Sequence, residues 1–493
     1  MSSVPLWTVD AMAQAMGAQT MGAQTMGAQT LGASRGGVLP ASISGISIDS
    51  RSIRRGDAFF AIKGDARDGH DFVSTALANG AGLAVVAIEQ RDSFPTDAPL
   101  LVVADVLEGL RDLARAARAR SQAKVIGVTG SVGKTGTKEA LRLALARDGE
   151  THASVASYNN HWGVPLSLAR CPAHVDFAIF EMGMNHAGEI EPLAKLVRPH
   201  VAIITTIEPV HLEFFPAGIE GIADAKAEIF AGLEPGGAAV INRDNPHYAR
   251  LRQKAEAARV GNIVAFGEAA DADARVLKFS LHPDCSVVSA SVLGTEVTYK
   301  LGTPGKHLIW NSLAVLAAAK LAGADLALAA LALAELKPVI GRGARITLRL
   351  NGGNAQLIDE SYNANPASMR AALSVLGQTA IGARGRRIAI LGDMLELGAA
   401  GEKLHRELAE AAIANDVDLV FCSGPLMRAL YDALPAGRQG GYAETSAGLE
   451  TAVISMVQPG DAIMVKGSLG SRMGPLVKVL EREFSSPPAQ QDA

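Results

Sequence analysis

Short runs of apolar residues, each ending in glycine or polar side chains, recur along most of the chain. In its middle part the runs are KVIGVTG (124–130), VDFAIFEMG (175–183), VAIITTIEP (201–209) and GAAVINRDN (237–245). Segments with apolar residues at helical spacing separate them. Continuous apolar runs of this length are typical of strands buried on both faces of a parallel sheet. The pattern predicts a doubly wound domain of alternating strands and helices.

A second series of the same kind follows, and a shorter one precedes. The later runs are AQLIDESYN (355–363), RRIAILGDM (386–394), DLVFCSG (418–424) and AIMVKGS (462–468). A chain of 493 residues is too long for one core. We therefore expect an α/β protein of three domains, a small N-terminal α/β domain (1–119), a central domain with a mostly parallel sheet (120–344) and a C-terminal Rossmann-like domain (345–493). GRGAR (Gly341–Arg345) is the expected hinge between the last two.

Two segments depart from this pattern. The most apolar region, Leu313–Leu336, is interrupted by Lys320 and Asp325, whereas a membrane span needs about 20 uninterrupted apolar residues. It predicts two packed helices with a turn near Gly323, and no membrane insertion. The second segment repeats MGAQT three times between Met16 and Thr30. A five-residue period matches no solenoid repeat, so residues 16–34 are interpreted as a low-complexity insertion.

Composition narrows the possible partners and compartment. The formal net charge of −4 and an aromatic content of 4% offer neither a basic surface nor stacking platforms, so no nucleic-acid partner is expected. The three cysteines, Cys171, Cys285 and Cys422, lie far apart and form no C-x-x-C pair. Reduced thiols are the simplest explanation. The first thirty residues lack the basic start and apolar run of a secretory signal, so we expect a cytoplasmic protein.

The stretch VTGSVGKTGTKEAL, Val128–Leu141, has the features of a phosphate-binding loop between a strand and a helix. Gly133, Lys134 and Thr135 match the second half of G-x-x-x-x-G-K-[ST], but Val128 stands where the first glycine would be. A glycine-rich turn leaves backbone N–H groups and the positive helix end facing an anion. Lys134 would then reach the β- and γ-phosphates and Thr135 would bind Mg²⁺. A purely structural glycine turn is the alternative.

Other candidate residues follow the predicted strands. They are Glu181, Glu208 with His211, Asp359 with Glu360, Asp393 and Lys466. In open parallel sheets ligands bind beyond the carboxyl ends of the strands, where these residues would lie. Lys226 lies on a predicted helix, and its position alone predicts a charged residue on the surface.

Taken together, the motifs resemble those of the Mur ligases, the ATP-dependent amide-forming ligases of bacterial peptidoglycan synthesis. The resemblance is carried, in order, by TGSVGKT, YNNHWGVPL, EMGMNHAGEI, EPVHLEFF, AKAEIF, INRDNP, GKHLIWN, DESYNANPASM, LGDMLELG and VKGS. The family's loop has the short form G-x-x-G-K-[ST], so Gly130 takes the place of its first glycine. SYNANP, EMG with a following N-x-x-G-E-I, and LGDM-x-ELG are most similar to the ligases that add D-alanyl-D-alanine to UDP-N-acetylmuramoyl-tripeptide.

The resemblance implies one domain each for the UDP-sugar, for ATP and for the incoming amine. Because the chemistry involves several sites, we expect a monomer whose domains close on ligand. The resemblance also implies transfer of the γ-phosphoryl group of ATP to the peptide carboxylate, followed by attack of the amine of D-alanyl-D-alanine on the acyl phosphate. Charge neutralisation by lysine and Mg²⁺ is the main means of bringing the two anions together.

It also implies roles for single residues. Lys134, Glu181, His211 and Lys226 would be catalytic. Thr135 and Glu181 would hold a first Mg²⁺, and His211 with Lys226, as its CO₂-derived carbamate, a second. ATP would contact Gly130, Ser131, Val132, Gly133, Lys134, Thr135, Gly136, His307, Asn311, Arg345, Asp359 and Glu360. The substrates would contact Ser50, Arg51, Lys63, Asp68, Asn159, Asn160, Asn363 and Lys466.

The chain departs from the family pattern at two places. Glu360 precedes SYNAN where the family usually has Asp, so the ribose contact shifts or passes to Asp359. The end of VKGSLGSRM also differs from the expected arginine-serine form, which leaves Arg472 without an assigned role.

Four alternatives stay open. A related ligase adding a single amino acid would be expected to carry a D-N-P-R-type motif in its third domain, but the DNP of this chain is Asp244–Pro246, in the central domain. Folylpolyglutamate synthase would lack the N-terminal IDSR domain. A non-catalytic nucleotide-binding regulator on this fold is disfavoured by the intact Lys134, Glu181 and His211. A P-loop motor or GTPase would need a Walker B aspartate where VDFAIFE ends in glutamate.

Overall fold

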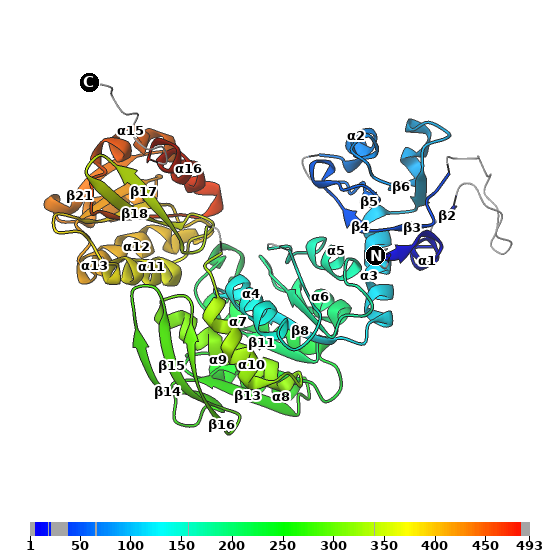
Figure 1. Ribbon diagram of the computed structural model, residues 1–493, viewed down its shortest axis with the longest axis horizontal. Coiled ribbons are helices and arrows are strands. Elements are labelled where there is room, and N and C mark those ends of the chain that lie inside the picture. The colour runs from blue at the N-terminus through cyan, green and yellow to red at the C-terminus, as the bar shows by residue number, and fades with distance from the viewer. Residues whose placement is uncertain are drawn as a thin grey trace.

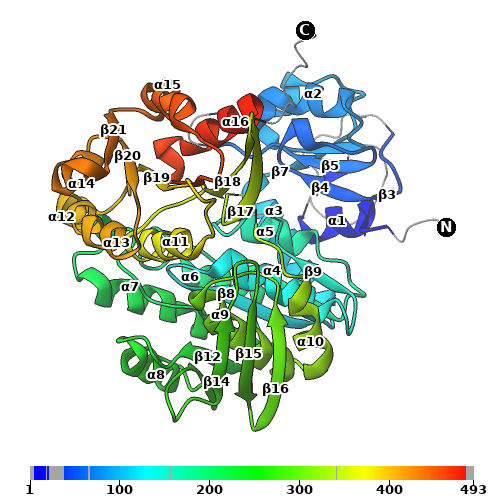
Figure 2. The same cartoon turned by 60° about the vertical axis from the view of Figure 1, so that its left-hand side comes forward.

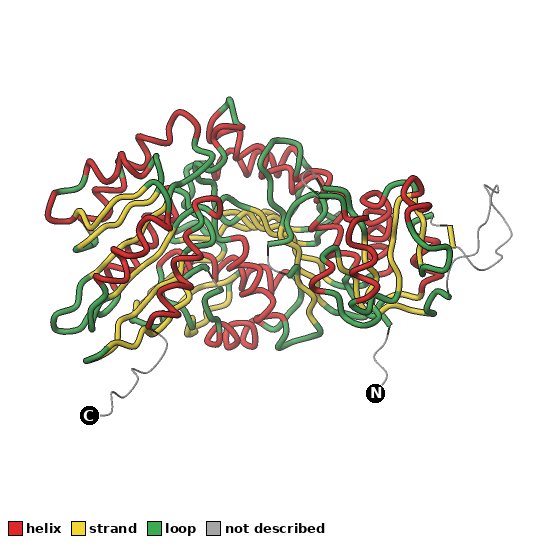
Figure 3. The backbone as a smooth tube through the Cα atoms, turned by 90° about the horizontal axis from the view of Figure 1, so that it is seen from above, coloured by secondary structure: helices red, strands yellow, loops and turns green. Residues whose placement is uncertain are grey.

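The computed structural model describes residues 5–17, 19–20, 38–64, 67–155, 157–339 and 341–484. Figure 1 shows three α/β bodies in chain order, the blue N-terminal domain at one end, the cyan-to-green central domain in the middle and the yellow-to-red C-terminal domain at the other end. Seen from above in Figure 3, the yellow strands run between layers of red helices. The expected three-domain α/β architecture is confirmed.

The N-terminal domain is built on a five-stranded sheet with the order β2-β7-β6-β5-β4, in which only β2 is antiparallel to its neighbour. A two-stranded ribbon of β1 and β3 lies beside it. The strands are β1 (Trp7–Thr8), β2 (Gln19–Thr20), β3 (Ser42–Ile43), β4 (Gly45–Ser47), β5 (Asp57–Phe60), β6 (Leu83–Ala87) and β7 (Leu100–Val103), and the helices are α1 (Val9–Ala15), α2 (Val73–Ala78) and α3 (Val106–Arg120).

Only part of the MGAQT tract is described. Met16 caps α1 and Gln19–Thr20 form β2, whereas residues 18 and 21–37 lie outside the described residues, so the low-complexity interpretation stays a prediction. The long helix α3 then leads into the central domain and packs on its helix α5.

The central domain contains a nine-stranded sheet with the order β16-β15-β14-β13-β12-β11-β8-β10-β9. The strands from β9 to β14 in this order are parallel, and β15 and β16 add an antiparallel edge. The strands are β8 (Lys124–Thr129), β9 (Thr151–Ala153), β10 (Phe177–Glu181), β11 (Val201–Ile204), β12 (Ala238–Asn242), β13 (Asn262–Gly267), β14 (Ala274–Leu281), β15 (Ser286–Val292) and β16 (Thr295–Leu301). The helices are α4 (Lys134–Leu145), α5 (Gly163–Ala169), α6 (Ile190–Val197), α7 (Gly218–Ala227), α8 (Tyr248–Ala257), α9 (Lys306–Leu321) and α10 (Leu326–Ala332).

The burial of β8 explains why its sequence is apolar throughout. Val125 belongs to the core cluster under α5 and α6, while Ile126 and Val128 belong to the cluster under α4 and α9. Successive strand residues point to opposite faces, so a strand covered on both sides cannot alternate with polar residues. The sheet also divides here, because β10 and β11 pair with β8 on its two sides. Ligands bind at such a switch point in open α/β sheets.

The apolar region around Leu313–Leu336 forms two helices, as predicted. α9 ends at Leu321, Gly323 turns the chain with φ 88°, and Asp325 caps α10 by accepting hydrogen bonds from two N–H groups of its first turn. Of the helices that the structure describes, none is long and apolar enough to cross a membrane.

The C-terminal domain contains a six-stranded sheet with the order β17-β18-β22-β19-β20-β21, parallel except for the edge strand β17. Its first strand begins one residue before the expected domain boundary. The strands are β17 (Ala344–Leu350), β18 (Gly353–Glu360), β19 (Arg387–Gly392), β20 (Leu419–Ser423), β21 (Gln439–Ala443) and β22 (Ala462–Lys466). The helices are α11 (Pro366–Gln378), α12 (Gly401–Arg406), α13 (Leu408–Ala414), α14 (Met427–Ala433), α15 (Ser446–Met456) and α16 (Met473–Phe484). All eight apolar runs quoted from the central and C-terminal parts form strands.

Candidate active site

A cavity of about 680 Å³ lies between the central and C-terminal domains. One wall is formed by residues that follow β8, β10 and β11, and the other by residues that follow β18 and β22. Figure 2 shows α11 on the side of the C-terminal domain that faces the central domain. The carboxyl ends of strands from two sheets thus contribute to one site, as the sequence predicts for each sheet separately.

The glycine loop after β8 enters this cavity at the start of α4. Gly133 is the N-cap of α4 with φ 85°, and no side chain caps the helix, which leaves backbone N–H groups of its first turn without a protein acceptor at the cap. Lys134 folds back over the loop, and its Nζ donates hydrogen bonds to the carbonyl oxygens of Gly130 (2.7 Å) and Ser131 (3.4 Å). Burial lowers the pKa of Lys134, and the charge of Glu181 opposes this shift. The loop therefore presents N–H donors and an ammonium group suited to an anion.

Gly130 explains the unusual first half of the motif. Its φ is 143°, and a Cβ atom at this position would lie 1.9 Å from Oγ1 of Thr205 on the segment after β11. A side chain here would force the loop away from the neighbouring strand. Glycine is therefore required at Gly130 by tertiary packing, whereas Val128 is a buried strand residue.

A hydroxyl, a carboxylate and an amide converge beside the loop. Oε2 of Glu181 accepts a hydrogen bond from Oγ1 of Thr135 (2.9 Å), and Oε1 accepts one from Nδ2 of Asn159 (2.7 Å). Glu181 is 1% exposed, so its oxygens are held in place. Oxygen donors of this kind suit Mg²⁺, which usually keeps some ligands from water or phosphate. Among the described residues no group of three or more His, Cys, Asp and Glu side chains is placed to hold a metal ion. A cation here would therefore need phosphate oxygens among its ligands, in addition to the protein oxygens.

His211 and Lys226 occupy different positions relative to the cavity. His211 lines it, and its Nδ1 contacts Oε2 of Glu396 from the C-terminal domain. Lys226 lies near the end of α7 and is 1% exposed, so the sequence-based reading of a surface charge is wrong. Burial, and then the charge of Lys134, lower the pKa of Lys226 well below its ordinary value. A neutral, nucleophilic amine is the form that this environment favours.

The far end of the central wall contains the predicted nucleotide residues His307 and Asn311 at the start of α9. Asp244, Asn245 and Trp310 line the same end and were not among the predicted contacts. Asp244 accepts a hydrogen bond from Nε1 of Trp310 (3.0 Å). The signal was present in INRDNP, which follows β12 as the other polar clusters follow their strands.

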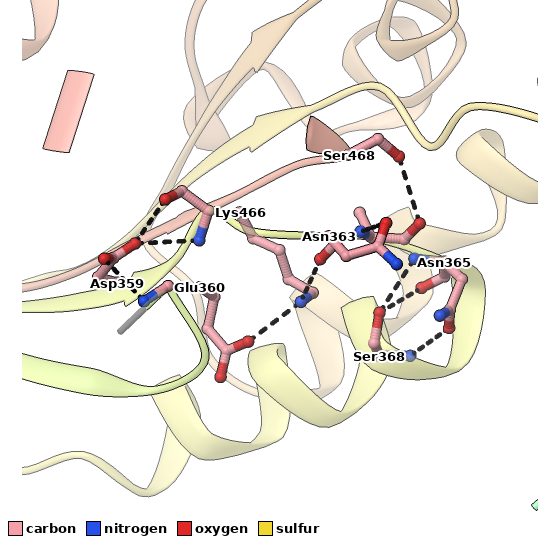
Figure 4. A network of polar contacts seen from close by, with 10 residues as sticks. Asp359, Glu360, Asn363, Asn365, Ser368, Lys466 and Ser468 are labelled. Carbon is pink, nitrogen blue, oxygen red and sulfur yellow. Dashed lines mark hydrogen bonds and ion pairs between the residues drawn. The ribbon is translucent and has the colours of Figure 1, made fainter. Parts of the chain in front are cut away.

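The C-terminal wall is organised around Lys466 at the end of β22 (Figure 4). Its Nζ donates to Oε2 of Glu360 (3.1 Å) and to the carbonyl oxygen of Asn363 (3.0 Å), and its side chain is 3% exposed. Glu360 and Asn363 line the cavity. Asp359 does not, because its carboxylate accepts hydrogen bonds from Ser361 and from the N–H of Gly341. Of the two acids considered for the ribose contact, Glu360 is therefore the one that faces the cavity.

The arginine on the cavity wall is Arg342, where the sequence suggested Arg345. Arg342 stacks on the ring of Tyr362 at 4.4 Å and donates to Oγ of Ser157 (3.2 Å). Arg345 is already part of β17, is absent from the cavity lining, and donates to Oε1 of Gln356 (3.3 Å) on the neighbouring strand β18. GRGAR contains both residues, and only the turn geometry at Gly341 and Gly343 decides which one points inward.

The predicted substrate residues of the N-terminal domain lie apart from the cavity. Ser50 and Arg51 follow β4, and Lys63 with Asp68 follow β5, so all four lie at the carboxyl end of neighbouring parallel strands. Arg51 is exposed and ion-paired with Asp49. Asn160 is separate again. Its Oδ1 accepts from the N–H of Gly163 (2.9 Å), and it borders a second hollow of about 940 Å³ between α3, α5 and α6.

Comparison with known proteins places this site in a family. Models described as the Mur ligase family catalytic domain, the Mur ligase middle domain and the Mur ligase glutamate ligase domain match residues 42–118, 128–319 and 344–469. A protein of Escherichia coli (strain K12) called UDP-N-acetylmuramoyl-tripeptide–D-alanyl-D-alanine ligase is 34% identical over 441 residues, which cover 89% of this chain and 94% of the relative.

Solved structures agree. The crystal structure I of MurF from Acinetobacter baumannii superposes with a TM-score of 0.81 at 31% identity, covering 97% of this chain and 100% of that chain. MurF ligase from Thermotoga maritima in complex with ADP superposes with a TM-score of 0.73 at 27% identity, covering 90% and 98%.

Proposed function

The chain belongs to the Mur ligase family, and we propose that it is the ligase that joins D-alanyl-D-alanine to UDP-N-acetylmuramoyl-tripeptide at the expense of ATP. The observation that carries the substrate assignment is the similarity to relatives of that name over nearly the full length of both chains. The products would be ADP, phosphate and UDP-N-acetylmuramoyl-pentapeptide, in peptidoglycan synthesis.

The cavity supports the chemistry of this reaction. A peptide carboxylate attacks the γ-phosphorus of ATP, the bond to the β-γ bridging oxygen breaks, and ADP leaves with that electron pair. The amine of the dipeptide then attacks the acyl phosphate, an amide bond forms, and phosphate leaves as the amine loses a proton. Nζ of Lys134 lies 2.7 Å from the carbonyl oxygen of Gly130, within the loop that would hold the phosphates. When ATP binds, Nζ would move from the loop carbonyl oxygens onto the phosphates. Once ATP binding has placed it there, its charge would stabilise the transferred phosphoryl group without further rearrangement during the reaction.

The residues around Thr135 and Glu181 fit Mg²⁺ bound jointly with nucleotide phosphates, which would offset negative charge on the transferred group. We extend the proposal to a second Mg²⁺ near His211, with Lys226 modified by CO₂. The unprotonated amine of Lys226 would form a bond to the carbon of CO₂ while one C–O π bond opens onto oxygen. Loss of a proton from the nitrogen would then leave a carbamate with an anionic oxygen as ligand. Its burial and lowered pKa support this step.

The reaction is tested by phosphate release from ATP, Mg²⁺ and UDP-N-acetylmuramoyl-tripeptide, with and without D-alanyl-D-alanine. We expect release that requires the dipeptide, together with a product heavier by one dipeptide in mass spectrometry. Release that is indifferent to the dipeptide but appears with a single amino acid would overturn the substrate assignment and leave the family assignment standing.

The carbamate is tested separately by ¹³C NMR of protein equilibrated with ¹³C-bicarbonate. A carbamate resonance present in the native chain and absent from Lys226→Arg is expected, and a spectrum unchanged by that substitution would contradict the modification. We also propose that the protein is a monomer, since one chain supplies both walls of the cavity. Light scattering coupled to size exclusion tests the monomer. The cytoplasm is the location that we propose from the sequence.

A further inference from the structure

His211 is held in a backbone conformation that is uncommon for residues other than glycine. It lies seven residues after the end of β11 with φ 55°, and the short 3₁₀ helix η4 (Leu212–Phe214) begins directly after it. Left-handed backbone without glycine is unusual and marks sites where the surrounding structure imposes the geometry. Part of the structure around His211 belongs to another domain, because the carboxylate that contacts its ring comes from the C-terminal domain.

The partner, Glu396, belongs to the LGDMLELG loop that follows β19 of the C-terminal domain. Glu396 is also left-handed, with φ 64°. Its Oε2 contacts Nδ1 of His211, and its carbonyl oxygen accepts a long hydrogen bond from the N–H of Glu213 (3.5 Å). The 3₁₀ helix η7 (Gly398–Ala400), just after Glu396, packs on η4. Two loops with imposed backbone geometry therefore meet across the domain interface, and the His–Glu pair lies at their contact.

The chemistry of imidazole gives this pair a consequence. A carboxylate at Nδ1 favours the tautomer that carries its proton there, which leaves the lone pair of Nε2 free. Histidines that bind metals commonly have such a carboxylate on the other nitrogen, which orients the ring and raises its basicity. His211 lines the cavity, so the geometry of the pair is that of a metal-ligating histidine and its supporting acid.

We propose that Glu396 is a positioning residue for His211, and that docking of the C-terminal domain on the central domain thereby completes the second cation site. Glu396 does not touch the reacting atoms. It acts through the ring of His211, and it does so only when η4 and η7 are in contact. Cation binding at His211 and domain docking would then reinforce each other, because each favours the same arrangement. This inference rests on the proposed function in one respect, namely that His211 binds a cation.

The test counts Mn²⁺ ions bound in the presence of a non-hydrolysable ATP analogue, by electron paramagnetic resonance. The chain, Glu396→Ala and Glu396→Gln are compared with Glu402→Ala, which removes an exposed acid paired with Arg406 in the same domain. We expect two bound ions in the native chain. In Glu396→Ala one of them should bind about 10–100-fold more weakly, while the ion shared with Thr135 and Glu181 is unchanged. Glu396→Gln, whose amide oxygen still accepts from Nδ1–H, should recover part of the loss, and Glu402→Ala should match the native chain.

A double-mutant cycle separates positioning from a general structural effect. If Glu396 acts through His211, then His211→Ala combined with Glu396→Ala should bind Mn²⁺ no more weakly than His211→Ala alone. Independent, additive losses would overturn the proposal. So would unchanged or tighter Mn²⁺ binding in Glu396→Ala, since tighter binding would show that the carboxylate competes with the cation for the ring. A native chain that binds a single Mn²⁺ would also overturn it. That result would not decide the proposed ligase activity, which dipeptide-dependent phosphate release tests separately. Equal thermal unfolding of the variants excludes misfolding.

Discussion

Two strand-to-helix turns face each other across the cavity, and their helix N-termini are treated in opposite ways. In the central domain α4 begins at a glycine that supplies no side-chain cap. In the C-terminal domain α11 begins at Asn365, which forms a reciprocal capping box with Ser368, and Pro366 follows as the first helical residue. The second helix satisfies its own N–H groups, whereas the first leaves them for a ligand. Of these two turns, the proposed phosphate site is the one whose helix has no side-chain cap.

The largest expected effect comes from removing the charge beside the uncapped helix. Lys134→Ala should lower ligase turnover about 10²–10³-fold, because it deletes a preorganised cation from the transferred phosphoryl group. Turnover is measured as dipeptide-dependent phosphate release. Lys403→Ala, at an exposed lysine of α12, is the matched control and should leave turnover unchanged. Equal turnover in the two variants would mean that the loop of α4 is not the phosphate site.

The backbone of the uncapped turn can be tested by adding one methyl group. Gly133→Ala places a Cβ on a residue with φ 85°, 2.8 Å from Nδ2 of Asn311, so we expect a loss of unfolding free energy of about 1–2 kcal/mol and weaker ATP binding. Gly136→Ala is the control in the same helix, since its added Cβ would meet nothing within 4 Å. It should raise the free energy of unfolding by about 0.5–1 kcal/mol. Chemical denaturation compares them, and equal effects would contradict a special role for the cap position.

The contribution of the opposing wall to ATP binding is tested by comparing two arginines of the same short segment. Arg342→Ala should raise the KM for ATP roughly ten- to a hundredfold, as expected for one lost charge-assisted contact. Arg345→Ala should leave it nearly unchanged, because Arg345 lies on β17 and is absent from the cavity lining. Steady-state kinetics with varied ATP distinguish the two, and a larger effect at Arg345 would reverse the assignment made from the structure.

The smallest effect concerns the capped helix. Asn365→Ala should lower the free energy of unfolding by about 1 kcal/mol, while Asn365→Asp should be close to neutral because Asp also caps. Thr445→Ala, which removes the N-cap of α15, should cost a similar amount, since its side chain accepts from the N–H of Gly448. Urea unfolding measures all three. If Asn365→Ala is neutral while Thr445→Ala is costly, the helix N-terminus of α11 is open to a ligand after all, and the contrast with α4 fails.

Local sequence was enough to predict the strands, the glycine loop and the set of polar residues at the carboxyl ends of the strands. These features depend on neighbouring residues. A strand buried on both faces needs an unbroken apolar run, and the start of a helix is signalled by the residues of the turn directly before it. Lys134, Thr135, Glu181 and His211 were found in this way, and the structure brings them to one cavity or its edge.

Long-range packing sets the features that depend on residues far apart in the chain. It places Glu360 and not Asp359 on the cavity wall, because successive residues of a strand point to opposite faces. It places Arg342 and not Arg345 there, because Arg342 lies in the turn before β17 whereas Arg345 is already part of that strand. It buries Lys226, which the sequence alone marked as a surface charge, and so changes the proton affinity of its amine. It also joins His211 to Glu396, 185 residues away, across a domain interface that no local pattern describes. Local spacing specifies which groups are available, and long-range packing specifies which of them meet.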